Sequence, residues 1–177
     1  MAFDRDKFKS LVHYVCWRCK DDPSRLGAVK LNKTLWVADF TAYYNSSSPI
    51  TGARYVKRKH GPVPGAIMPV LNELESQGAL SIRDTNFHGF SKKEYRVLTD
   101  PDTRDFTAEE LAIADAAIEL VCEQHTATSI SDASHDHIWQ AADDGEEIPY
   151  YTVFSVPGSI TDDEREWARQ ELEMIGR

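Results

Sequence analysis

Two pairs of residues have the types and spacing to bind a metal or to carry out redox chemistry. Cys16 and Cys19 form a CxxC motif, but both fall on the apolar face of a predicted helix, without a second CxxC or a βαβ pattern. We interpret them as small core residues. Cys122 and His125 lie three residues apart and could share a zinc ion, yet nothing nearby supplies a third and a fourth ligand. The sequence therefore predicts no cofactor and no metal site.

The stretch SISDASHDHIW contains the residue types of a nucleophilic triad, because Ser134 adjoins His135 and Asp132 is close by. Adjacent residues on a helix point in different directions, so Ser134 and His135 cannot pair in the usual way. A structural role fits better. Ser131 or Asp132 can cap a short helix, and His135 and Trp139 share one helix face. We expect no catalytic activity, and an enzyme built around His135 is the weakest functional hypothesis.

Composition predicts a globular protein with its own core. The chain has 177 residues, of which 41% are hydrophobic and 28% charged, and should bury roughly 70% of the surface that it exposes when unfolded. No apolar run approaches the roughly 18 residues needed to span a membrane, and the N-terminus lacks the apolar stretch of a signal peptide. We expect a cytoplasmic protein with no membrane partner.

Charge is distributed unevenly along the chain. Residues 1–98 contain 16 Lys and Arg against 9 Asp and Glu, whereas residues 99–177 contain 4 against 20. The acidic half could fold against the basic half, or each half could meet a partner of opposite charge. The basic residues form either a solvated face or a partner-binding patch. The candidate partner-binding residues are Arg54, Lys57, Arg58, Lys59, His60, Lys92 and Lys93.

Hydrophobic periodicity predicts helices over about 4–20 and 28–45 and a β-hairpin within 80–98. Helix 28–45 is apolar on two faces, and Asp39 within it needs a hydrogen bond or a cation, for which Arg54 and Lys57 are candidates.

A further helix is expected within 61–77. We predict that Pro62, with its preset φ, starts this helix after the glycine, and that Pro64 fixes the following turn.

Helix, turn, helix and hairpin follow one another in the order of a winged helix. The predicted fold is α+β and mainly helical, with a winged-helix-like helix-turn-helix, a β-hairpin and additional C-terminal helices. Residues 61–77 contain no Lys or Arg, which argues against major-groove recognition by this helix. Capping-box pairs at Thr107 and Glu110, and at Thr161 and Glu164, predict two helices in the C-terminal half.

Three segments in this order resemble the Panacea domain, the SocA-type antitoxin domain also found in phage-associated proteins. They are KLNKTLWVADFTAYY, ITGARYVKRKHGPVPGAIMPVLNELESQG and SISDASHDHIWQAADDGEEIPYYTVF. The resemblance covers about residues 28–155, so we expect one domain over 1–155 with an acidic C-terminal helix over 156–177 docked on it. Asn32 and Thr34 make the central helix more polar than is usual in the family. The matching residues, expected to be mostly structural, are Lys30, Leu31, Asp39, Gly61, Pro62, Val63, Ser131, His135 and Trp139.

The resemblance implies a non-catalytic domain that neutralises a genetically linked toxin by direct binding. Some members of the family act as adaptors that deliver the toxin to a bacterial protease. We therefore predict an antitoxin-type protein whose partners are a toxin encoded nearby and a protease. One hypothesis is that the acidic half masks a basic surface of the toxin, an association that salt would slow. The alternative is a winged-helix DNA-binding regulator that contacts phosphates, with nucleic acid as the less favoured partner.

Overall fold

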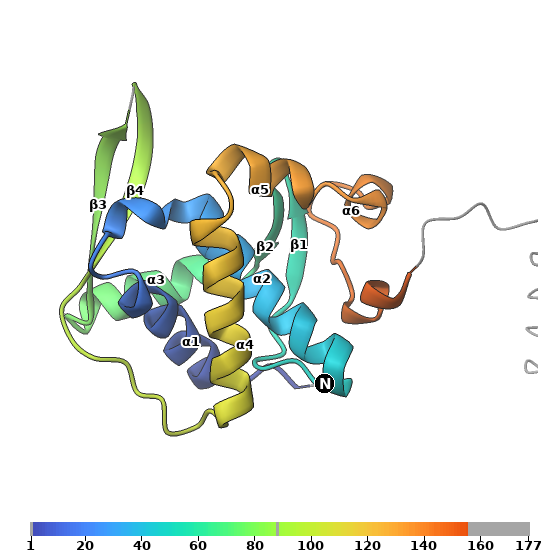
Figure 1. Ribbon diagram of the computed structural model, residues 1–177, viewed down its shortest axis with the longest axis horizontal. Coiled ribbons are helices and arrows are strands. Elements are labelled where there is room, and N and C mark those ends of the chain that lie inside the picture. Colours follow the sequence, from blue (N-terminus) through green and yellow to red (C-terminus); the bar gives the residue numbers. More distant parts are fainter. Residues whose placement is uncertain (1, 88, 156–177) are drawn as a thin grey trace, which may run out of the picture.

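Helix α2 lies at the centre of the computed structural model, which describes residues 2–87 and 89–155 (Figure 1). It packs against α1, α4, α5, the β1–β2 hairpin and β4, as expected of a central helix. Leu31, Leu35 and Ala38 are buried on one face, whereas the aromatic face is only partly covered and Tyr44 is exposed. The described part is therefore an α+β fold made mainly of helices. In chain order the elements are α1 (Arg5–Arg18), η1 (Pro23–Arg25), α2 (Gly27–Ser46), β1 (Tyr55–Arg58), β2 (Gly61–Pro64), α3 (Ile67–Ser76), β3 (Leu80–Phe87), β4 (Phe90–Val97), α4 (Ala108–Ile118), η2 (Glu119–Glu123), α5 (Ala127–Ala133), α6 (His137–Ala141) and η3 (Tyr150–Phe154).

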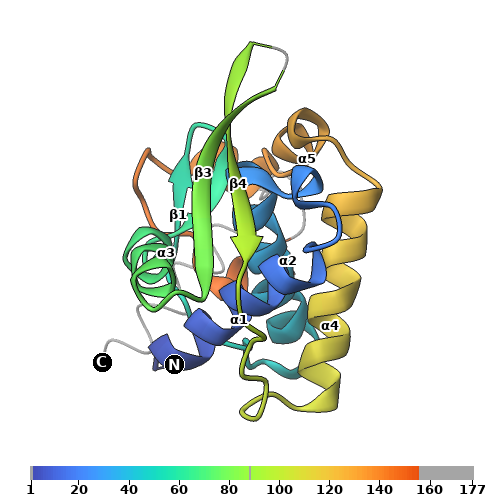
Figure 2. The same ribbon diagram turned by 90° about the vertical axis from the view of Figure 1, so that its left-hand side faces the viewer.

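Two antiparallel hairpins flank the helices. The predicted β3–β4 hairpin is confirmed, and its tip projects beyond the helical body (Figures 1 and 2). The second hairpin pairs β1 with β2, in a register that places Lys57 opposite Pro62. Residues 145–148 run antiparallel along β1, where the N–H of Ile148 donates to the carbonyl of Tyr55 at 2.8 Å. The C-terminal part of the described chain is thus fixed to the first hairpin.

The predicted helix start at Pro62 is wrong. Gly61–Pro64 is extended and forms β2, and α3 begins only at Ile67. A proline φ near −65° is also compatible with extended backbone, and the β1 partner is close in sequence, so pairing prevails over helix formation. A strand pair rather than a short turn therefore separates α2 from α3, and the helix-turn-helix of a winged helix is not established.

The core contains the cysteines. Cys16, Cys19 and Cys122 are buried free thiols, which confirms the interpretation of Cys16 and Cys19 as core residues. Within residues 2–87 and 89–155, no cluster of three His, Cys, Asp or Glu side chains could hold a metal ion. None of the helices described is both long and apolar enough to cross a membrane.

Ion pairs connect the basic half of the sequence to the acidic half. For example, Lys7 Nζ lies 2.6 Å from Glu110, and Arg18 Nε lies 2.7 Å from Asp115. These contacts favour the hypothesis that the acidic half folds against the basic half. Further pairs of this kind are Arg25 with Glu123, Arg54 with Glu147 and Arg58 with Asp144.

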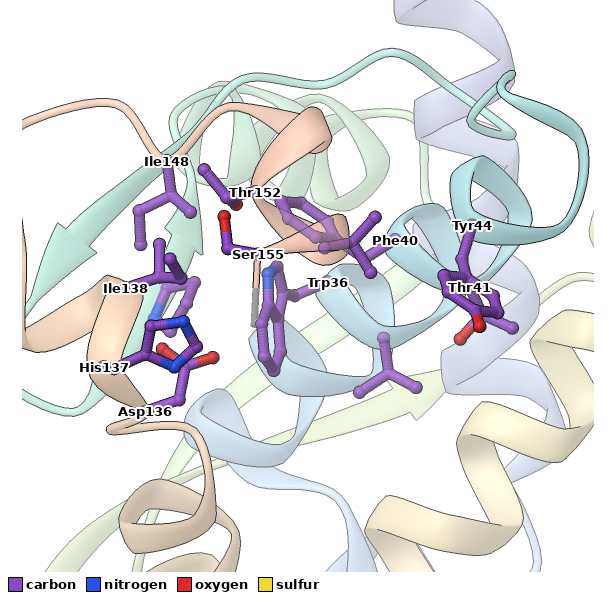
Figure 3. Close-up of a pocket in the computed structure, with 13 residues that line it drawn as sticks. Trp36, Phe40, Thr41, Tyr44, Asp136, His137, Ile138, Ile148, Thr152 and Ser155 are labelled. Carbon is purple, nitrogen blue, oxygen red and sulfur yellow. The ribbon is translucent and has the colours of Figure 1, made fainter. Parts of the chain in front are cut away.

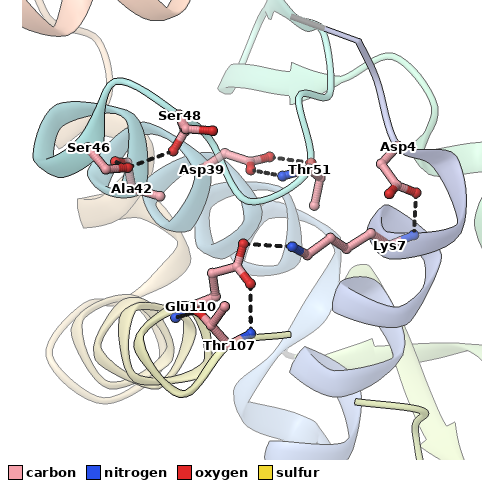
Figure 4. A network of polar contacts seen from close by, with 9 residues as sticks. All are labelled: Asp4, Lys7, Asp39, Ala42, Ser46, Ser48, Thr51, Thr107 and Glu110. Carbon is pink, nitrogen blue, oxygen red and sulfur yellow. Dashed lines mark hydrogen bonds and ion pairs between the residues drawn. The ribbon is translucent and has the colours of Figure 1, made fainter. Parts of the chain in front are cut away.

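Asp39 is a buried carboxylate (Figure 4). Neutral hydrogen-bond donors, and not a cation, occupy its oxygens. It accepts from the backbone N–H of Thr51 at 2.8 Å, from the Thr51 hydroxyl at 2.6 Å and from the Tyr55 hydroxyl at 2.8 Å. The predicted pairing with Arg54 or Lys57 is therefore wrong. Arg54 pairs with an acid at the surface, and Lys57 donates to a backbone carbonyl. The carboxylate thus ties α2 to the chain that leads into β1.

The capping box that begins α4 is present as predicted. The Thr107 hydroxyl accepts from the N–H of Glu110, whose carboxylate accepts from the N–H of Thr107 and also binds Lys7 (Figure 4). The second predicted capping box and the helix over 156–177 lie outside the described residues.

The caps of the short helices differ from those predicted. Ser131 and Asp132 lie inside α5 rather than at its start. Thr126 caps α5 by accepting from Ser129, and Asp136 caps α6 by accepting from the N–H of Trp139 at 2.8 Å. The helical segment is therefore two helices with a break at residues 134–136, a change of direction that sequence spacing does not reveal.

Removing the Tyr55 hydroxyl tests the Asp39 contact. Tyr55→Phe should lower the free energy of unfolding by about 1 to 2 kcal/mol, because a buried carboxylate loses one of its donors. Urea unfolding measures this change. Tyr44→Phe is the control, since Tyr44 is exposed, and it should have almost no effect. Equal stability of Tyr55→Phe and the unsubstituted protein would contradict this role of Asp39.

Candidate functional site

Two neighbouring hollows lie along one side of α2. The α2 residues that line them fall at 28, 29, 32, 33, 36, 37, 40, 41 and 44, a spacing that places them on one face of the helix. The basic hollow has a volume of about 400 Å³. Its lining residues are Ala28, Val29, Asn32 and Lys33 of α2 together with Arg58, Lys59, His60, Val63 and Asp144. The aromatic groove has a volume of about 300 Å³. Its lining residues are Trp36, Val37, Phe40, Thr41 and Tyr44 of α2 together with Pro62, Ile148 and residues from 136–138 and 152–155.

The aromatic groove opens to solvent between α2 and the chain that follows α5 (Figure 3). Trp36 stands at its centre, facing Asp136 and His137 on one side and Ser155 on another. The Nε1 atom of Trp36 is buried and has no hydrogen-bond partner in the part of the chain that the structure describes. The groove can therefore accept an apolar group, and Trp36 Nε1 is a donor available to a polar acceptor beside that group.

Exposed aromatic rings extend the groove at the C-terminal end of α2. Tyr44 is 60% exposed and Phe154 is 51% exposed, and their rings stack with centroids 5.7 Å apart. Phe154 also contacts Tyr43, which contacts Tyr150 in turn. Tyr150 is anchored because its hydroxyl donates to the carbonyl of Ala53 at 2.6 Å. A ladder of rings therefore connects the surface to the core and holds the exposed pair in place.

Lys33 is a buried lysine beside the basic hollow. It is 1% exposed, and its Nζ donates to the carbonyl of Pro62 at 3.2 Å. Burial lowers the pKa of Lys33 to about 7, because the interior disfavours the charged form.

Gly61 allows β2 to approach Lys33 closely. Its φ of +94° favours glycine, and a Cβ at this position would collide with Lys33 Nζ and with Ser134 Oγ. Three segments that are distant in sequence, α2, β2 and the end of α5, therefore meet at this glycine.

His135 and Trp139 form a stacked pair above β1. Their ring centroids lie 3.8 Å apart, and Trp139 Nε1 donates to the carbonyl of Arg58 at 3.1 Å. Lys57 Nζ lies 4.2 Å from the centroid of the Trp139 ring. Burial, followed by the nearby charge of Lys33, lowers the pKa of His135, whose Nε2 is buried without a partner among the described residues.

The suspected triad is not assembled. The Ser134 hydroxyl donates to the carbonyl of Ser131 at 2.7 Å rather than to the imidazole, which stacks on Trp139. Asp132 is exposed on α5 and acts on His135 only as a nearby charge. These residues do not form a nucleophilic site.

The structure brings together three of the seven candidate partner-binding residues. Arg58, Lys59 and His60 line the basic hollow, although Arg58 also lies 3.6 Å from Asp144. The others have separate contacts: Arg54 pairs with Glu147, Lys57 covers Trp139, Lys92 contacts the carbonyl of Ser24, and Lys93 pairs with Asp84.

Sequence reasoning missed Lys33 and Trp36. The available signal for Lys33 was its place in a helix that is apolar on two faces. Trp36 could not be distinguished from a core residue. Among the motif residues, Lys30 Nζ donates to the carbonyl of Cys122 at 3.1 Å and Leu31 is fully buried.

Comparison with known proteins gives one family. The family model described as antitoxin SocA-like, Panacea domain, matches residues 31–140. The match includes most of α2, both hairpins and the helices from α3 to most of α6. No curated protein and no solved structure gives a significant match to the chain.

A matched pair of glycine substitutions isolates the contact at Gly61. Gly78→Ala should lower the free energy of unfolding by about 1 to 2 kcal/mol through backbone strain alone. Gly78 also has a positive φ, but a Cβ at this position would meet nothing within 4 Å. Gly61→Ala should cost about 1 to 3 kcal/mol more, because the added methyl must displace packed side chains. Chemical denaturation of both variants gives the difference. Equal losses would show that the close approach contributes nothing beyond backbone strain.

Lys33→Met should stabilise the protein at neutral pH. Because the folded state releases the Lys33 proton near pH 7 and the unfolded state near 10.5, the unfolded state holds more protons between these values, and stability rises with pH. Below pH 7 the folded protein carries the full cost of burying the charged Lys33 ammonium. The free energy of unfolding of Lys33→Met should therefore exceed that of the unsubstituted protein by roughly 2 to 5 kcal/mol at pH 6.5. Urea unfolding should show this gain narrowing by about half at pH 9.

Lys20→Met is the matched control, since Lys20 is exposed and should leave the pH trend of the unsubstituted protein unchanged. A Lys33→Met variant that is less stable than the unsubstituted protein at pH 6.5 would show that the buried ammonium group stabilises the folded state.

Proposed function

Because the chain belongs to the SocA-like antitoxin family that contains the Panacea domain, we propose that it neutralises a toxin protein by direct binding through the aromatic groove. We further propose that it acts in the cytoplasm, that it needs no catalytic activity, and that the toxin is encoded beside it. The single observation that supports this surface is the exposed, stacked pair of Tyr44 and Phe154 at the mouth of an apolar groove.

Exposed aromatic rings of this kind suit a protein interface. Tyr and Trp are enriched at interfaces, and they contribute most where a partner excludes water from them. Tyr44 and Phe154 are held by the ring ladder, so little conformational entropy is lost when a partner covers them. The unpartnered Trp36 Nε1 supplies a directional contact for a backbone carbonyl of the toxin.

The charge around the groove indicates the type of partner surface. Residues 131–147, which include the wall at Asp136, contain six Asp and Glu and no Lys or Arg. Glu147 and Asp144 are paired with Arg54 and Arg58, whereas Asp136, which lines the groove and caps α6, has no ion pair among the described residues. We expect the toxin to present an apolar side chain flanked by basic residues, in agreement with the masking hypothesis.

The regulator alternative has less support. Residues 61–77, which include α3, lack Lys and Arg, and the basic residues Arg54 and Lys93 pair with acids at 2.6 and 3.0 Å. Phosphate contacts would have to break these pairs, at a cost that toxin binding at the groove does not carry.

Co-expression with the adjacent reading frame tests the function and the surface together. The neighbour alone should stop growth, and this chain should restore it. Thr41→Arg should abolish rescue, because Thr41 is exposed in the groove and the new cation would block it without removing core atoms. Met68→Arg is the control, since it adds the same charge at an exposed position on α3. Growth curves and thermal unfolding of both variants provide the readout.

A harmless neighbour, or toxicity without rescue, would overturn the proposed function. Equal rescue by Thr41→Arg and Met68→Arg would leave the function standing but overturn the groove as the contact surface. The half-life of the toxin in the same cells separates two mechanisms: direct binding leaves it unchanged or longer, whereas delivery to a protease shortens it.

A further inference from the structure

Lys33, one of the residues that line the basic hollow, has a buried ammonium group with few partners. An ammonium has three N–H donors, yet for Lys33 the described part of the chain supplies one hydrogen bond, to the carbonyl of Pro62. No Asp or Glu among the described residues forms an ion pair with it. Buried charges are normally paired, so this arrangement is incomplete without a further acceptor.

The surroundings of Lys33 add positive charge. Arg58, Lys59 and His60 line the same hollow, where Asp144 is the acid among the lining residues and lies 3.6 Å from Arg58. Below pH 7, where Lys33 is protonated, three cations against one carboxylate leave an excess of about two positive charges, without counting the histidine. The site therefore matches an anion with two negative charges better than one with a single charge.

The hollow also has the shape and polarity of a small-molecule site. Its volume of about 400 Å³ falls in the range of ligand pockets, and Ala28, Val29 and Val63 give it an apolar wall. Asn32 lines it with a buried Oδ1 that has no hydrogen-bond partner among the described residues. The amide of Asn32 can present an acceptor or, if rotated, a donor to a ligand.

We propose that the basic hollow binds a small molecule bearing a phosphate group, with Lys33, Arg58 and Lys59 contacting the phosphate and the apolar wall contacting the organic part. A phosphate dianion supplies the acceptors that Lys33 lacks and neutralises the local excess of charge. This site is separate from the aromatic groove, but both lie on α2, so a ligand in one is positioned to influence a partner in the other.

The test uses phenyl phosphate and benzoate as probes, with the isolated full-length protein at pH 6.5 and constant ionic strength. Calorimetric titration should show binding of phenyl phosphate and at least tenfold weaker binding of benzoate. Lys33→Met should reduce the affinity for phenyl phosphate at least tenfold, and Lys59→Glu, at an exposed position, should reduce it without affecting the core. Lys20→Met, an exposed lysine on another surface, should bind like the unsubstituted protein.

Each other outcome overturns the proposal. Absence of binding, or equal binding by all variants, would show that the hollow is not a phosphate site. Benzoate that binds as tightly as phenyl phosphate would assign the hollow to carboxylates instead. Because the titration uses no toxin, its result is independent of the growth assay, and either proposal can fail while the other stands.

Discussion

The close approach of β2 to α2 at Gly61 is the contact on which the rest of the structure depends. At this point the β2 backbone leaves no space for a Cβ, and Lys33 and Ser134 occupy the room that it would need. The contact sets how far the β1–β2 hairpin stands from α2. That separation determines the width of both hollows, since Pro62 lines the aromatic groove and Val63 lines the basic hollow.

The sequence was sufficient for the elements whose signal is local. Helices α1, α2 and α4 follow from apolar periodicity and capping residues, and β3–β4 follows from alternation around a glycine-containing loop. The errors concern contacts between distant residues. Whether Pro62 starts a helix or joins a strand depends on a partner strand, and whether Asp39 meets a cation or Tyr55 depends on how the chain returns to α2.

The candidate site was predictable only in part, for the same reason. The basic run before Gly61 could be read from the sequence. The stacking of His135 on Trp139 could not, because His135 lies in the break between α5 and α6 and does not share a helix face with Trp139. The groove could not, because it forms where α2 meets residues about a hundred positions later in the sequence. Ion pairs between the two halves make the same point: folding brings together opposite charges that are far apart in the sequence.

The arrangement around β1 also protects the protein from self-association. A free strand edge offers unpaired N–H and C=O groups, with which a strand of another chain can pair. Here residues 145–148 cover one edge of the hairpin. The other edge belongs to β2, where Pro62 and Pro64 have no N–H to offer. Pro62 and Pro64, which do not start a helix, thus make the β2 edge a poor template for aggregation. An exposed aromatic surface can therefore lie beside this hairpin.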